Sequence, residues 1–241
     1  MRLSRSHVDR IGERFRKGEI DPDVIVELSR YRNGFASAYR AVEILLRERL
    51  GLEVSGRPAK STTAIVDKLQ RESIRLSQMQ DIAGCRVIVN GMHGQDNLVE
   101  DLEVLLEGVK VVDRRSNSSH GYRAVHLIVN ASFYPVEIQI RTRMQHMWAD
   151  ISEKLADSYG QEVKYGRGNE AVVKLLRNLS TEIERLEKIR FDRNIIRRRG
   201  PLRYYSFAPG VTSRRIEKDL ARLDRESLYQ IRRILSTGVE V

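Results

Sequence analysis

Cysteine and long apolar stretches are nearly absent from this sequence. Its 241 residues include one cysteine, Cys85, which excludes an internal disulfide and a cysteine-rich metal site. Cys85 lies in the apolar run 82–89, where we expect a buried, unreactive thiol. No stretch approaches the roughly 18 consecutive apolar residues that a membrane-spanning helix needs. Residues 1–17 are polar and charged, unlike a secretory signal. We therefore expect a cytoplasmic protein without a membrane partner.

Proline is also scarce, and no proline-rich linker, internal repeat or low-complexity tract divides the chain. The sequence is 41% hydrophobic and 32% charged, which is enough apolar content for a core and too much for a disordered chain. The excess of 43 lysines and arginines over 33 aspartates and glutamates gives a formal charge of +10. That charge favours nucleotides, RNA or DNA as partners without choosing among them, because solvated helix faces account for such an excess equally well.

Hydrophobic spacing predicts helices along much of the chain. Asp21-Pro22 is an N-cap followed by proline at the first helical position. Apolar residues then recur at three- and four-residue spacing up to Gly51, so we expect one long amphipathic helix there. Further helices are expected at 61–73, 97–107, 142–158, 171–189 and 213–235.

Short β-branched segments between these helices predict strands at 82–89, 109–112, 123–129 and 136–140. The loop between the last two is short enough to make them an antiparallel pair. The pattern predicts an α/β fold with an α+β mixed sheet of about four or five strands covered by helices. We divide the chain into a helical N-terminal extension (1–50), a mixed core (51–165) and a helical C-terminal extension (166–241).

Polar side chains gather on the last two predicted strands. Glu137 and Gln139 share one face of their strand, and strand alternation places Tyr122 and His126 on one face of the preceding strand. Such a cluster suits a nucleotide pocket, with an ordinary solvated sheet face as the alternative. Asp81 stands immediately before a strand, a common place for a Mg²⁺ ligand, and a turn-capping aspartate is the alternative there.

Four motifs in the same order resemble the synthetase domain of the RelA/SpoT alarmone enzymes. They are Lys68-Leu69-Gln70-Arg71, Asp81-Ile82-Ala83-Gly84-Cys85-Arg86, Gly121-Tyr122-Arg123-Ala124-Val125-His126 and Glu137-Ile138-Gln139-Ile140-Arg141-Thr142, with Trp148 at the usual distance after the last. The resemblance covers about residues 20–165. It implies a nucleotidyltransferase-like sheet and a RelA/SpoT-like synthetase core at 51–165.

The resemblance implies a GTP diphosphokinase, which transfers the β,γ-diphosphate of ATP to the 3′-hydroxyl of GDP or GTP and makes the alarmones (p)ppGpp. Asp81 would hold Mg²⁺, and Glu137 would orient or deprotonate the acceptor hydroxyl and share the metal. The donor ATP would contact basic side chains, which are Lys60, Lys68, Arg71 and Arg86, with Arg57 as a further candidate. The acceptor would contact Tyr122, which stacks on its base, together with His126, Gln139 and Arg115.

Some positions depart from the family pattern. Pro58 and Ala64 stand where the donor motif has an arginine and a serine, and Arg57 lies one residue away. Ser118 stands where the acceptor loop usually carries a lysine or arginine that contacts phosphates. This departure keeps open a second acceptor, because toxic family members pyrophosphorylate the 3′-terminal adenosine of tRNA or make adenosine alarmones. An inactive RNA-binding module on the same fold is a third interpretation.

The sequence contains no His-Asp dipeptide, so we do not expect the hydrolase half of the bifunctional family members. The resemblance therefore implies a small, synthesis-only enzyme of the stringent response, with ATP and GDP or GTP as ligands and tRNA as the alternative acceptor. The apolar stripe of the predicted helix 213–235 either packs on the catalytic core or docks another protein. That protein would be a second copy in a homo-oligomer, or a regulatory partner such as the antitoxin of a toxin–antitoxin pair.

Overall fold

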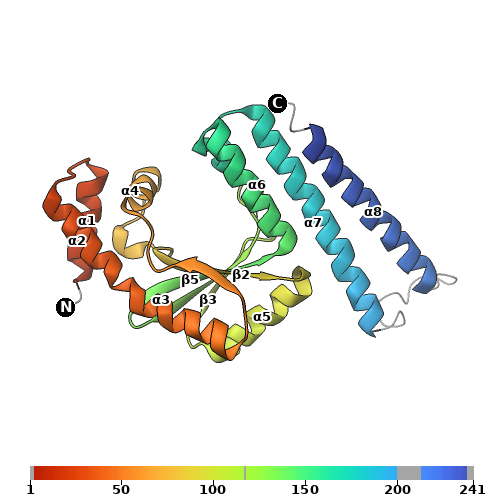
Figure 1. Ribbon diagram of the computed structural model, residues 1–241, viewed down its shortest axis with the longest axis horizontal. Coiled ribbons are helices and arrows are strands. Elements are labelled where there is room, and N and C mark those ends of the chain that lie inside the picture. Colours follow the sequence, from red (N-terminus) through yellow and green to blue (C-terminus); the bar gives the residue numbers. More distant parts are fainter. Residues whose placement is uncertain (1–2, 117, 200–212, 238–241) are drawn as a thin grey trace. The chain divides into compact units, whose positions relative to one another are not determined.

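The computed structural model of the chain describes residues 3–116, 118–199 and 213–237 (Figure 1). The chain forms two compact units, each assembled from three segments. The first unit is made of Met1–Val87, Asp101–Val112 and His126–Ile140, and the second of Ile88–Glu100, Asp113–Val125 and Arg141–Val241. The division of the sequence at residues 50 and 165 stays a prediction.

One five-stranded sheet is present, with the strand order β1-β2-β5-β4-β3. The strands are β1 (Val54–Arg57), β2 (Ala83–Val89), β3 (Lys110–Asp113), β4 (Val125–Ala131) and β5 (Tyr134–Thr142). The predicted mixed α/β class is confirmed, and four strands lie where the sequence pattern places them. The additional strand, β1, pairs antiparallel with β2. It buries only Val54, so it carries no alternating pattern that sequence analysis could detect.

Four α-helices lie wholly within the described residues of the first unit. They are α1 (Arg5–Arg16), α2 (Pro22–Asn33), α3 (Phe35–Ile44), which continues into a π-helical turn at Leu45–Arg49, and α4 (Thr62–Arg71). Figure 1 shows α1, α2 and α4 side by side, and all three are in contact. Phe15, Leu28 and Phe35 are completely buried in this unit. Helix α1 was not predicted, although its buried residues Val8, Ile11, Gly12 and Phe15 recur at helical spacing after the N-cap Ser4.

The long helix predicted from Asp21 to Gly51 is instead two helices that meet at Gly34. The Gly34 amide donates to the Tyr31 carbonyl, three residues earlier, at 3.1 Å. An α-helical amide donates to the carbonyl four residues earlier. A side chain at position 34 would overlap the hydroxyl of Tyr134, which packs against this point. Position 34 therefore needs glycine because of a contact with a distant part of the sequence, which the local apolar pattern does not contain.

The second unit is mainly helical. Figure 1 shows α6 (Arg143–Tyr159), α7 (Glu170–Arg199) and α8 (Ser213–Thr237) side by side, and a 3₁₀ turn at Gln161–Tyr165 connects the first two. Trp148, Leu176, Ile183 and Ile231 belong to their shared core. Helix α7 extends beyond the predicted end near Ile189, and Asp224 of α8 pairs with its Arg190 and Arg193 at 2.9 and 3.1 Å.

Helix α5 (Gly91–Leu105) begins earlier than the predicted Asn97. Its first residues include two glycines and several polar side chains, so the apolar spacing starts only in the second half of the helix. Within the residues described above, no helix is long and apolar enough to cross a lipid bilayer.

Candidate active site

Two lysines surround the carboxylate of Asp81 in the first unit. Lys60 lies between β1 and α4, where its amide donates to the Ile82 carbonyl at 2.7 Å. Lys68 lies on α4, whose start is capped by Ser61. The Lys68 ammonium is 3.0 Å from Asp81 Oδ1, and the Lys60 ammonium donates to Oδ2. The sequence therefore folds so that an aspartate before β2 meets two cations that were both predicted to bind phosphates.

Burial opposes the ionisation of Asp81, whose side chain is only 20% exposed. The charges of Lys60 and Lys68 outweigh that effect and hold the pKa of Asp81 below its usual value. Asp81 is therefore ionised at neutral pH, as a metal ligand must be. Both lysines are mostly buried too, which concentrates opposite charges where water screens them poorly.

A second carboxylate, Glu137, lies on β5 and has hydrogen-bond partners on β5 and on the neighbouring strand β4. His126 Nδ1 lies 2.8 Å from Glu137 Oε1, and the Gln139 amide donates to Oε2 at 2.7 Å. Glu137 and Gln139 share one face of β5, as their spacing predicts. His126 reaches them from β4, which neighbours β5 in the sheet. Three of the predicted site residues thus form one hydrogen-bonded group.

The pKa of Glu137 is also lowered. Burial raises it, but hydrogen bonding and charge from His126, followed by the Gln139 amide, outweigh the burial. The negative charge of Asp81 acts in the opposite direction and raises the same pKa by a smaller amount. Because ionised Glu137 can only accept hydrogen bonds, His126 Nδ1 must carry the proton between them.

The sequence predicts three further donor residues, Arg57, Arg71 and Arg86. Arg71 pairs with Glu72 at 3.1 Å and is about one-third exposed. Arg57 and Arg86 lie on the paired strands β1 and β2, opposite Gly84 and Ser55 respectively. Their assignment to ATP stays a prediction.

In the second unit, Tyr122 lies in a tight turn rather than in a strand. Strand β4 begins at Val125, and Tyr122 forms an isolated bridge with Ser119. Gly121 has a φ of +95°, a conformation that favours glycine. A Cβ there would lie 2.8 Å from the Trp148 ring. The strand alternation applied to Tyr122 is therefore wrong, because the positive φ of Gly121 interrupts the extended backbone.

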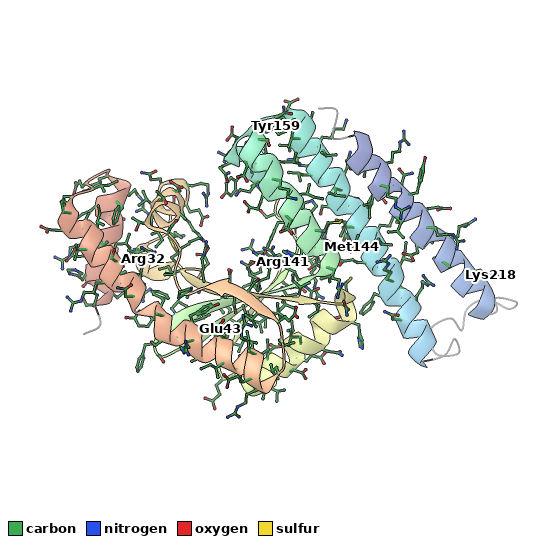
Figure 2. The ribbon with its side chains drawn as sticks, viewed as in Figure 1. Arg32, Glu43, Arg141, Met144, Tyr159 and Lys218 are labelled. Carbon is green, nitrogen blue, oxygen red and sulfur yellow. The ribbon has the colours of Figure 1, made fainter. Side chains whose placement is uncertain are left out.

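Arg141 positions the Tyr122 ring, a role that sequence analysis missed. Arg141, labelled in Figure 2, lies near the end of β5, and its side chain is buried. Its guanidinium carbon is 5.0 Å from the centre of the Tyr122 ring, and its Nη2 donates to the Tyr122 hydroxyl at 3.1 Å. The indole of Trp148 approaches the same ring edge-on at 6.4 Å. An arginine at a strand end, on the same face as Glu137 and Gln139, was the available signal.

Arg115, the predicted cation for the acceptor, is occupied by two carboxylates. It pairs with Asp113 at 2.7 Å and with Asp96 at 2.5 Å. Burial opposes the charge, but hydrogen bonds to Asp113 and Asp96 outweigh it and raise the pKa of Arg115. Arg123 was predicted to lie in a strand, but β4 begins only at Val125. The Arg123 guanidinium contacts Ser180 and Glu184 of α7.

The described residues contain no group of three or more histidine, cysteine, aspartate or glutamate side chains that could hold a metal ion. Mg²⁺ is usually held by only one or two carboxylates together with substrate phosphates. The ionised pair of Asp81 and Glu137 fits that requirement.

Cys85 does not contribute, because it is buried and its burial raises the pKa of the thiol to about 12. The predicted burial of Cys85 is confirmed.

Comparisons with known proteins show what this part of the chain resembles. Residues 56–162 match the family model described as a region found in RelA / SpoT proteins. GTP pyrophosphokinase YjbM of Bacillus subtilis is 33% identical, over 46% of this chain and 58% of that protein. An uncharacterized protein of Mycobacterium tuberculosis is 37% identical, over 44% of this chain and 41% of that protein. The chain thus spans less than two thirds of the length of these relatives.

Solved structures agree with the sequence comparisons. Small alarmone synthetase 1 of Bacillus subtilis has a TM-score of 0.56 and 26% identity, over 71% of this chain and 98% of that chain. A second structure of the same synthetase, bound to its product pppGpp, has a TM-score of 0.55, covering 69% of this chain and 95% of that one. Residues 56–162 are therefore similar to the RelA/SpoT family, and the solved structures that resemble the chain are small alarmone synthetases.

Proposed function

We propose that the protein is a pyrophosphokinase that transfers the β,γ-diphosphate of ATP to the 3′-hydroxyl of GDP or GTP. The observation that carries this proposal is the environment of the two ionised carboxylates. Asp81 is placed among cations suited to a triphosphate, whereas Glu137 is placed among hydrogen-bond partners suited to a hydroxyl. The names of the relatives, GTP pyrophosphokinase and small alarmone synthetase, support the same chemistry.

The donor half of the reaction belongs to Asp81, Lys60 and Lys68. In the absence of nucleotide the lysines neutralise Asp81, and on ATP binding they would turn to the phosphate oxygens. Phosphoryl transfer depends mainly on positioning and on charge neutralisation, so these groups supply what the reaction needs. Mg²⁺, held by Asp81 and Glu137 together with the phosphates, would add further charge neutralisation when bound.

The acceptor half belongs to Glu137. The 3′-hydroxyl oxygen forms a bond to the β-phosphorus, the bond from that phosphorus to the α,β-bridging oxygen breaks, and AMP leaves. The hydroxyl proton passes to Glu137, or Glu137 orients the hydroxyl as the proton departs. His126 and Gln139 hold the carboxylate in one orientation. Tyr122 would stack on the acceptor base with the ring face that Arg141 does not cover.

A tRNA or adenosine acceptor is the second candidate, favoured by the formal charge of +10 and by Ser118 in the acceptor loop. An antitoxin, a regulatory protein or a homo-oligomeric partner stays a proposal under either acceptor.

The direct test incubates the protein with ATP, Mg²⁺ and GDP or GTP and separates the nucleotides. Equal amounts of AMP and of ppGpp or pppGpp are expected. If neither product forms while ATP still binds, the protein is not a synthetase of guanosine alarmones.

A further inference from the structure

A hollow of about 610 Å³ lies beside the turn that carries Tyr122. Its lining residues are Arg114, Ser118, Ser119, His120, Gly121 and Arg177. All six belong to the second unit. The lining contains two guanidinium groups, an imidazole and two hydroxyls, and it contains neither a carboxylate nor an apolar side chain.

The two arginines of this hollow differ from their neighbours. Arg115 and Arg123 pair with acidic side chains, whereas across the described part of the chain neither Arg114 nor Arg177 has a carboxylate partner. The Nε of Arg114 is buried and makes no hydrogen bond. A buried donor without a partner costs about 1–3 kcal/mol, so a site that retains one is suited to an incoming acceptor oxygen. His120 and Arg177 both lie beside Gly166. A Cβ added at Gly166 would be 2.5 Å from His120 Nδ1 and 3.2 Å from Arg177 Nη2.

The chemistry of the lining is that of a phosphate site. Guanidinium groups bind phosphate oxygens through paired, charge-assisted hydrogen bonds, and serine hydroxyls can add further donors. The backbone that presents them is held in place. Tyr122 N donates to Ser119 O at 2.9 Å, and Ser180 of α7 donates to Gly121 O at 2.7 Å. A phosphate in this hollow would therefore be fixed relative to the Tyr122 ring.

On the basis of the proposed function, we propose that Arg177, together with Arg114, binds the 5′-phosphates of the acceptor and makes the enzyme specific for a nucleoside 5′-di- or triphosphate. Ser118 brings no charge to this loop, and Arg115 is held by Asp113 and Asp96. The missing charge comes instead from α7. Arg177 lies outside residues 56–162, the part that matches the family model, so the family motifs do not contain it.

The test compares acceptors that share the 3′-hydroxyl and the base but differ in phosphates. Transfer from ATP to guanosine, GMP, GDP and GTP is measured for the wild type and for Arg177→Gln. The variant should lower kcat/KM for GDP and GTP by about tenfold or more, and should change kcat/KM for guanosine by less than about twofold. The KM for ATP should stay unchanged. Arg177→Lys should recover part of the loss, because it restores charge without the paired geometry.

Lys188→Gln is the matched control. It removes one positive charge from an exposed position on the same helix, about 16 Å further along, and should leave every acceptor unchanged. Equal losses for GDP and guanosine in Arg177→Gln would mean a structural role and would overturn the inference, as would no loss at all.

If the wild type transfers to no acceptor, the proposed function fails. Calorimetric affinities for GDP and guanosine then test the phosphate site alone, and equal effects of Arg177→Gln on both overturn it.

Discussion

At the scale of single residues, the candidate site contains two acids in different surroundings. Asp81 is neutralised by two lysines, and Glu137 is oriented by a histidine and an amide. Both have lowered pKa values in spite of burial. Different partners keep two nearby carboxylates ionised together, which is the condition for one to serve the donor phosphates and the other the acceptor hydroxyl.

Asp81→Asn should reduce transfer to every acceptor by about 100-fold or more, because it removes the charge that pairs with Lys60 and Lys68 and that would hold Mg²⁺ in the proposed function. It should also lower stability by about 2 kcal/mol, between the values for exposed and fully buried ion pairs. Product formation and thermal unfolding measure the two effects. Asp67→Asn, at an exposed position on α4, is the control and should change neither. A folded Asp81→Asn protein with full activity would end the assignment.

Glu137→Gln should lower kcat about 100-fold with little effect on ATP affinity, because the carboxylate acts on the acceptor hydroxyl. The lowered pKa of Glu137 also sets the sign of a pH effect on stability. Its ionised form stabilises the fold fully above the unfolded-state pKa, and this contribution is lost as the pH falls through the folded-state pKa. Acid denaturation curves of Glu137→Gln should lack that component. Unchanged turnover with weaker ATP binding would instead move Glu137 to the donor side.

At the scale of elements, the turn before β4 links Tyr122 to the helices of the second unit. Gly121→Ala should cost about 1–3 kcal/mol for the positive φ, and more for the overlap with Trp148. It should also raise the KM for GDP. Gly18→Ala is the control, because its φ is +77° and no atom lies within 4 Å of the added Cβ. If the two variants unfold at the same temperature, Trp148 does not constrain the turn.

The packing of α8 makes a second prediction at this scale. Ile231 is 4% exposed against α7, so Ile231→Ala should lower the free energy of unfolding by about 2–5 kcal/mol. Tyr229→Ala, at a side chain that is 64% exposed on the same helix, should change it by less than about 0.5 kcal/mol. Denaturant titration measures both. A loss confined to Tyr229→Ala would favour docking of another protein on α8 over packing within the chain.

Local sequence patterns predicted the elements whose stability is local. Helix α4 and strand β2 lie close to where apolar spacing placed them, and motif order identified Asp81 and Glu137. The interruptions were not predicted, because they depend on residues far away in sequence. Tyr134 packs against Gly34, where the helix is interrupted, and Trp148 packs against the turn at Gly121. The pairing of Lys60 with Asp81 likewise requires the fold, although both residues were identified from the motifs.

At the scale of the whole molecule, the charge of +10 is compatible with either class of acceptor. A free nucleotide needs a few well-placed cations. A tRNA needs many distributed ones, and its binding would weaken steeply with salt through counterion release. The hollow lined by Arg114 and Arg177 supplies the first kind of site. We therefore expect transfer to GDP to depend only weakly on salt concentration.

The most direct measurement offers all acceptors together. The protein is incubated with Mg²⁺ and ATP labelled at the γ-phosphate, in the presence of GDP, GTP, ADP and deacylated tRNA, and the labelled products are separated. The account predicts label in ppGpp and pppGpp, none in tRNA, and the loss of all labelled product in Asp81→Asn. Label in tRNA or in an adenosine nucleotide with no labelled guanosine product would contradict it.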